Sequence, residues 1–99
     1  MKDIIAERDL AGIGPEGTKF QITLKIGRPY MVESEDWACA VGAIGLYKRM
    51  REVHGNDSFQ ALMRAIKMAR RLLEYFIEDG GSLVAEEDGT PVEIAAIFI

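Results

Sequence analysis

The chain has very little of the chemistry that builds disulfides, metal sites and most catalytic centres. Cys39 is the only cysteine and His54 the only histidine among 99 residues, so no intrachain disulfide can form. One cysteine with one histidine cannot supply the four ligands of a zinc site, and no group of carboxylates has the spacing of a calcium-binding loop. We therefore expect no metal and no cofactor.

Long apolar runs are also lacking. The most apolar stretch, residues 92–99, is interrupted by Glu93 and is far shorter than the ~20 residues that a membrane-spanning helix needs. The first residues do not show the basic, apolar and small-residue pattern of a secretory signal. These absences predict a cytoplasmic protein without membrane insertion.

An excess of positive charge is lacking as well. The net charge is −4, and the acidic excess comes from residues 80–99, which contain no Lys or Arg. A chain without an arginine-rich stripe lacks the positive field that dominates affinity for nucleic acids. We expect no nucleic-acid partner and no gel shift. The basic residues that such a partner would have to use are Lys48, Arg49, Arg51, Arg64, Lys67 and Arg71.

The clearest positive signal is a helix over residues 57–79. Asp57 is a good N-cap residue, and Gln60 lies three residues on, where its side chain can reach back to the cap backbone. Gly80 and Gly81 predict the end of the helix. Apolar residues between these ends recur every three or four positions, which predicts one helix face in a core.

Before the helix the apolar period is two, which predicts strands. Phe20, Ile22, Leu24 and Ile26 alternate with polar residues, and a hairpin joins this strand to residues 4–10 through a glycine-rich turn. After a loop over residues 28–36, we expect a third strand at 37–44 and a fourth, exposed strand at 49–54.

Past the helix, residues 82–85 and 92–98 flank the Asp88-Gly89 turn signal and predict a short hairpin. With 48% hydrophobic residues, the chain suits a single domain over residues 1–99. The expected fold class is α+β, with a four-stranded antiparallel meander, one long helix packed across one face and a small C-terminal β element.

The helix carries more apolar surface than one sheet can cover. The expected core stripe is centred on Phe59, Met63, Ile66, Leu73 and Ile77. A second stripe has the spacing of packed helix pairs. Two explanations remain open for what covers the second stripe. The C-terminal residues could fold back onto it, either with Val92, Ile94, Ala96 and Phe98 or with Ala95, Ile97 and Ile99. Alternatively, an identical helix could cover it in a two-fold dimer. The residues of this predicted interface are Ala61, Ala65, Met68, Leu72 and Tyr75.

Arg70 falls within the expected core stripe. Its stem could cover the core while the guanidinium reaches water, or it could form a buried ion pair with a carboxylate of the sheet or the C-terminal segment. A catalytic Cys39–His54 pair would need a thiolate beside a base, but Cys39 lies in an apolar strand and is better explained as a core residue. We expect no catalytic residues.

Four local patterns follow one another along the chain: Ile26-Gly27-Arg28-Pro29, Asp36-Trp37-x-Cys39, Gly45-Leu46 and Gly55-x-Asp57-Ser58-x-Gln60-Ala61-Leu62. In this order and spacing they resemble a family of small bacterial proteins of unknown function, each about a hundred residues long. The resemblance covers roughly residues 4–81 and implies a bacterial intracellular α+β domain without an established reaction or ligand.

The surplus apolar helix surface favours a non-enzymatic protein-interaction domain. Its partner would be a second copy in a homodimer or another protein, and an accessory or immunity-like role is one form this could take. The alternative is a small-molecule binder or minor enzyme with a pocket between helix and sheet. The residues expected to line that pocket are Arg28, Tyr30, Trp37, Cys39 and His54.

Overall fold

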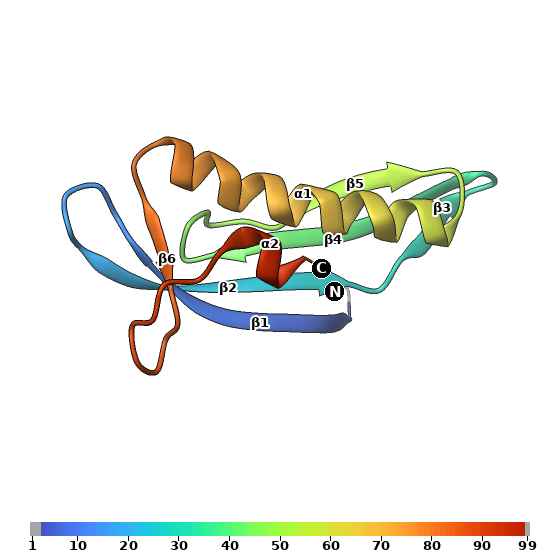
Figure 1. Cartoon of the computed structure of the whole chain (residues 1–99). Coiled ribbons are helices and arrows are strands. Elements are labelled where there is room, and N and C mark those ends of the chain that lie inside the picture. Colours follow the sequence, from blue (N-terminus) through green and yellow to red (C-terminus); the bar gives the residue numbers. More distant parts are fainter. Residues whose placement is uncertain (1–2, 99) are drawn as a thin grey trace.

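An open antiparallel sheet is covered on one face by a long helix, so the fold class is α+β as predicted (Figure 1). The structure is a computed structural model, and it describes residues 3–98 of the 99-residue chain. The elements are β1 (Ile4–Ile13), β2 (Lys19–Gly27), β3 (Tyr30–Glu33), β4 (Asp36–Ile44), β5 (Arg51–Gly55), α1 (Ser58–Glu78), β6 (Ser82–Val84) and α2 (Ile94–Ile97).

β4 is the strand on which the sheet is organised. Ala38 pairs with both Tyr30 of β3 and His54 of β5, and Val41 pairs with both Ile26 of β2 and β5. Since one residue cannot have two neighbours on one edge, β5 lies along one edge of β4, and β2 and β3 follow one another along the other. β1 lies beyond β2, and β6 pairs with the end of β1.

The predicted β1–β2 hairpin is confirmed, although β1 runs on to Ile13. Its predicted inward residues Ile22, Leu24 and Ile26 are buried, as the period of two requires. The opposite face is polar, because Thr23 Oγ1 donates to Asp9 Oδ1 at 2.8 Å and Lys25 pairs with Glu7. The hairpin therefore packs against α1 on one face only.

The loop predicted for residues 28–36 contains a strand that the sequence did not reveal. β3 has four residues, and its return into β4 is a tight turn in which Glu35 adopts a positive φ of 60°. Four residues followed by an acidic run are too short to show a period of two. Pairing with β4 stabilises this segment as a strand. The two later strands were predicted to within two residues.

The capping residues of α1 act largely as predicted. Asp57 Oδ1 accepts a hydrogen bond from the Gln60 amide at 2.7 Å, and Gln60 Oε1 accepts one from the Asn56 amide at 2.8 Å. The side chain of Gln60 thus reaches one residue beyond the cap. At the other end Gly80 has φ +99°, and the Gly81 amide donates to the Phe76 carbonyl at 2.9 Å, which closes the last turn.

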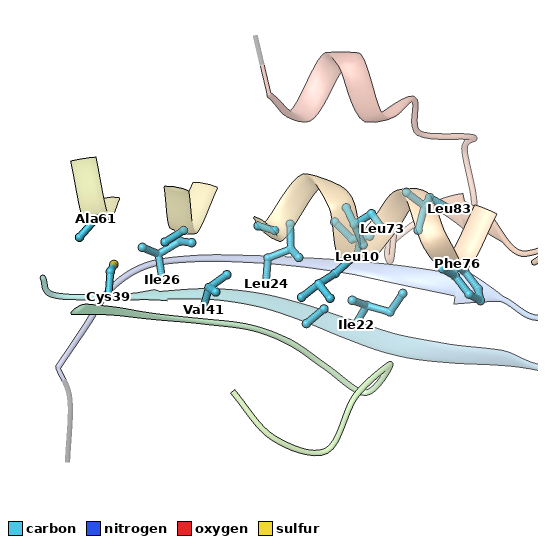
Figure 2. Packing of buried hydrophobic residues seen from close by; sticks show 14 residues of the cluster. Leu10, Ile22, Leu24, Ile26, Cys39, Val41, Ala61, Leu73, Phe76 and Leu83 are labelled. Atoms are coloured by element: carbon cyan, nitrogen blue, oxygen red, sulfur yellow. The ribbon is translucent and has the colours of Figure 1, made fainter. Parts of the chain in front are cut away.

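The predicted core stripe of α1 is wrong. Phe59 is 73% exposed and Met63 49%, and Ile66 and Ile77 are exposed too, whereas Leu73 alone of that stripe is buried. The small residues face the sheet instead, and Ala61 lies directly above Cys39 (Figure 2). The residues of α1 that are buried are Ala61, Ala65, Ala69, Leu72, Leu73 and Phe76.

Close contact between helix and sheet explains why the small residues of α1, and not the predicted core stripe, face the sheet. α1 lies over β4 and β5, and a Cβ atom on Gly55 of β5 would lie 2.6 Å from the Ala61 amide nitrogen. Only small side chains fit between backbones that approach so closely. Larger residues further along, such as Leu73 and Phe76, fill the space over β1 and β2 (Figure 2).

The predicted C-terminal hairpin is wrong in its second half. β6 adds to the main sheet, pairing Val84 with Ala11, and residues 85–91 turn back to a single bridge between Val84 and Pro91. Pro91 has no amide hydrogen with which to continue a ladder. The following residues form α2. Val92, Ile94, Ile97 and Phe98 pack against the core, so neither of the two alternating sets predicted for the C-terminal residues covers the second stripe of α1. Ile99 lies outside the described residues.

Candidate functional site

One side of α1 carries four exposed large apolar residues, and we call it the α1 apolar flank: Phe59, Met63, Ile66 and Ile77. Arg70 lies along the same side. A shallow groove of about 360 Å³ runs from Met63 and Ile66 to Phe98 beyond α2. Because a helix holds its side chains in fixed directions, this flank is a preformed surface.

The predicted interface does not form one surface. Ala61, Ala65 and Leu72 are fully buried against the sheet, and Met68 is half-buried. Tyr75 is 40% exposed, and the Arg71 guanidinium lies 4.2 Å from the centre of its ring. The surplus of apolar helix surface is real, but it lies on the stripe that was expected to face the core.

Arg70 points to solvent and pairs within its own helix. Its Nε atom is 3.2 Å from Glu74 Oε2, and its side chain is 45% exposed. Arg71 donates to Glu74 and Glu78 at 3.1 Å each. These bonds from Arg71 and Arg70 hold the pKa of the Glu74 carboxyl below its ordinary value. The guanidinium of Arg70 therefore reaches water, as the first alternative expects, although its stripe does not face the core, and a buried pair with the sheet does not form.

A second groove runs along the other side of α1, between the helix and the edge strand β5. It has a volume of about 630 Å³. Arg64 Nη1 crosses one end of it and donates to the His54 carbonyl at 2.8 Å. We call it the α1–β5 groove, and its lining residues are Val53, His54, Arg64, Lys67, Met68, Arg70, Arg71 and Glu74.

The five residues expected to line a ligand pocket are not brought together. Directly paired residues of neighbouring strands point to the same face, whereas successive residues point to opposite faces. Tyr30 and His54 both pair with Ala38, so they lie on the face away from the helix, and Trp37 and Cys39 lie on the helix face. The alternative of a small-molecule pocket built from these five therefore gains no support.

Local contacts occupy the polar members of that set. The Tyr30 hydroxyl donates to the Glu52 carboxylate, and His54 Nδ1 lies 2.9 Å from Asp36 Oδ1. Arg28 is exposed in the loop after β2, with Nε 3.6 Å from Asp3 Oδ2. No cluster of three His, Cys, Asp or Glu side chains suited to a metal ion occurs within residues 3–98.

Cys39 is a core residue. It is fully buried, its Sγ lies 3.2 Å from the Gly27 carbonyl, to which it can donate, and burial raises the pKa of its thiol. A thiol whose folded-state pKa is raised contributes stability below its unfolded pKa and loses it as pH rises through the folded value. The free energy of unfolding should therefore fall as the solution becomes alkaline.

We expect Cys39 to resist alkylation in the native protein. Iodoacetamide at pH 8 should modify it on the order of 100-fold more slowly than it modifies the urea-unfolded chain, because reaction requires an opening of the core. Mass spectrometry over a time course measures both rates. Equal rates in the two states would show that the thiol is accessible and would contradict its place in the core.

The chain matches the model of a family described as a domain of unknown function, DUF6968, over residues 6–94. The chain belongs to this family. No curated protein and no solved structure shows a significant match to the chain. The DUF6968 match includes β6 and the acidic turn, which lie beyond the segment that carried the resemblance, and it contains the whole of α1 with both of its exposed sides. In the described part of the chain, no helix combines the length and apolar character that crossing a bilayer demands.

Sequence patterns missed the α1–β5 groove because its walls belong to two different elements, which only the tertiary structure brings face to face. Val53 belongs to an edge strand, whereas Lys67 and Met68 lie in the middle of the helix. One signal was present. Ala61 and Ala65 are small residues four positions apart on one helix face, and Gly55 is a small residue just before the helix, a combination that allows close contact between a helix and a strand.

Proposed function

We propose that this DUF6968 chain is a non-enzymatic interaction domain that forms a homodimer through the α1 apolar flank. The single observation that carries the proposal is the exposure of Phe59, Met63 and Ile66 in consecutive turns of one rigid helix. Soluble proteins rarely leave such a contiguous apolar surface in water. At about 25 cal/mol per Å² of apolar area removed from water, covering these side chains would supply a large share of a binding free energy.

Charge complementarity supports a second copy as the occupant. In an antiparallel pair of α1 helices with a two-fold axis near Met63, Phe59 of one subunit would pack against the partner's Ile66 at a helix spacing of 1.5 Å per residue. Arg70 would then lie near the N-terminal end of the partner's helix, where Asp57 carries a negative charge. The same surface patch of each subunit would thus be complementary to its copy, as two-fold symmetry requires.

The groove beside this flank would extend the contact. A stable interface buries roughly 800 Å² on each partner, which is more than three side chains can provide. Phe98, half-buried and beside Met63 and Ile66, supplies further apolar area from the C-terminal segment. The proposed homodimer interface therefore includes Phe98 as well as α1.

A charge placed on the flank tests this function. We expect the wild-type protein at tens of micromolar to have twice the 11.0 kDa mass of the chain in sedimentation equilibrium. Phe59→Glu should weaken the dimer about 30-fold or more, because it removes the aromatic contact with the partner's Ile66 and places a charge in an apolar interface.

Tyr75→Glu is the matched control, because Tyr75 is an exposed aromatic residue on the opposite side of the same helix. It should leave the dimer intact. A wild-type chain that stays monomeric at tens of micromolar would refute the homodimer, and so would a dimer that Tyr75→Glu dissociates while Phe59→Glu leaves it unchanged.

A further inference from the structure

The α1–β5 groove gathers positive charge on a protein that is acidic as a whole. Four of its lining residues are Lys or Arg and one is Glu, whereas the whole chain has a net charge of −4. Arg70 and Arg71 share Glu74. None of the ion pairs among residues 3–98 involves Arg64 or Lys67. Two neighbouring cations of this groove thus lack a carboxylate partner within the described chain.

The floor of the groove is apolar. Val53 of β5 and Met68 of α1 are half-buried and line the groove together with the basic side chains. Its volume of about 630 Å³ falls in the range of about 300–1,000 Å³ that binding pockets have. Methionine adapts its shape to different apolar groups. The groove can therefore accept an apolar side chain and hold acidic groups on either side of it.

We propose that the α1–β5 groove binds an acidic segment of a different protein. An apolar side chain of that segment contacts Val53 and Met68, and its carboxylates accept hydrogen bonds from Arg64 and Lys67. Charge-assisted hydrogen bonds of this kind are shorter and stronger than neutral ones. Glu74 and Glu78 already engage Arg70 and Arg71, so two cations remain for carboxylates, too few for the extended row of phosphates of a nucleic acid.

The two sites are neighbours on α1. Arg64, Lys67 and Arg70 line both the α1–β5 groove and the shallow groove beside the α1 apolar flank, whereas Val53 and Met68 line the α1–β5 groove alone. A homodimer formed through Phe59, Met63 and Ile66, as proposed above, would leave Val53 and Met68 outside its contact. The protein would then present two such grooves.

Fluorescence anisotropy with short labelled peptides tests the proposal. The probe is an eight-residue peptide that alternates Glu and Leu, and its counterparts alternate Lys and Leu or Gln and Leu. We expect the Glu peptide to bind at least ~10-fold more tightly than either counterpart, with an affinity that falls as salt is raised, since exposed charges are screened within about 10 Å at 0.1 M.

Lys67→Glu should weaken binding of the Glu peptide about 10-fold or more. Lys19→Glu is the matched control, because it makes the same change of charge at an exposed site on β2 and should preserve binding. Arg64→Gln provides a second variant, which removes a groove cation and also its bond to the His54 carbonyl. Thermal unfolding curves confirm that each variant folds.

Three results would overturn the proposal. The first is equal binding of the Glu and Lys peptides, and the second is an equal effect of Lys67→Glu and Lys19→Glu. The third is displacement of the Glu peptide, at matched concentration, by single-stranded RNA or by a peptide of residues 85–93, which would assign the groove to nucleic acid or to a second copy. Phe59→Glu should leave peptide binding unchanged, so this test and the homodimer test fail independently.

Discussion

Gly45→Ala should destabilise the protein by about 3–5 kcal/mol, a large part of the roughly 5–15 kcal/mol that holds a domain folded. Gly45 has φ +104°, a conformation that costs an L-residue about 1–2 kcal/mol. A Cβ atom at this position would also lie 2.0 Å from the Gln21 carbonyl oxygen. That oxygen belongs to the backbone of β2, so relief requires β2 and β4 to separate where Thr23 pairs with Ile44.

Gly17→Ala is the control for this substitution. Gly17 has a similar φ of +95° in the β1–β2 turn, but a Cβ atom there would meet nothing within 4 Å. Its cost should be about 1 kcal/mol, because conformational strain is partly offset by the lower entropy of the unfolded chain. Urea denaturation of both variants isolates the steric contribution. Equal losses would show that Gly45 does not lie against β2 as described.

Leu72→Ala should destabilise the protein by about 2–5 kcal/mol, because Leu72 is 1% exposed and its truncation leaves a cavity between α1 and the sheet. Phe59→Ala should change stability by less than about 0.5 kcal/mol, since a side chain that is 73% exposed loses few contacts. This order reverses the one that the helix pattern predicts, in which Phe59 belongs to the core and Leu72 to a partner surface.

Both free energies should be measured by urea denaturation at submicromolar concentration. Dimerisation stabilises the folded state by mass action, and a dilute sample keeps that contribution out of the Phe59→Ala value. A loss of more than 2 kcal/mol for Phe59→Ala, together with a small one for Leu72→Ala, would return Phe59 to the core and remove the surface on which the homodimer proposal rests.

Local signals were sufficient for part of the fold. The ends of α1 were predicted within one residue, because Asp57, Gln60 and Gly80 form caps from neighbouring residues alone. The β1–β2 hairpin was predicted because a strict period of two places Ile22 and Leu24 on one face. Each of these signals depends on contacts that are close in sequence, and no distant residue had to be known.

Other parts depended on distant contacts. β3 forms because β4 pairs with it, and α2 forms where Ile94 and Ile97 can reach the core beside α1. The candidate sites were the part that the sequence predicted least well. Tyr30 and Cys39 are close in sequence, yet alternation along the strands sends them to opposite faces, and Arg28 lies in the loop between β2 and β3. The groove lined by Val53 and Lys67 joins segments that no local pattern links.

The amino-acid sequence by itself determined an α+β chain with one long capped helix, an N-terminal hairpin and more apolar helix surface than a single sheet can bury. Only the tertiary structure decided which side of that helix faces the sheet. Both stripes are apolar, so hydrophobicity could not choose between them. The choice follows from volume, because the close approach of α1 to Gly55 and β4 admits Ala61 and Ala65 and leaves Phe59 and Met63 in water.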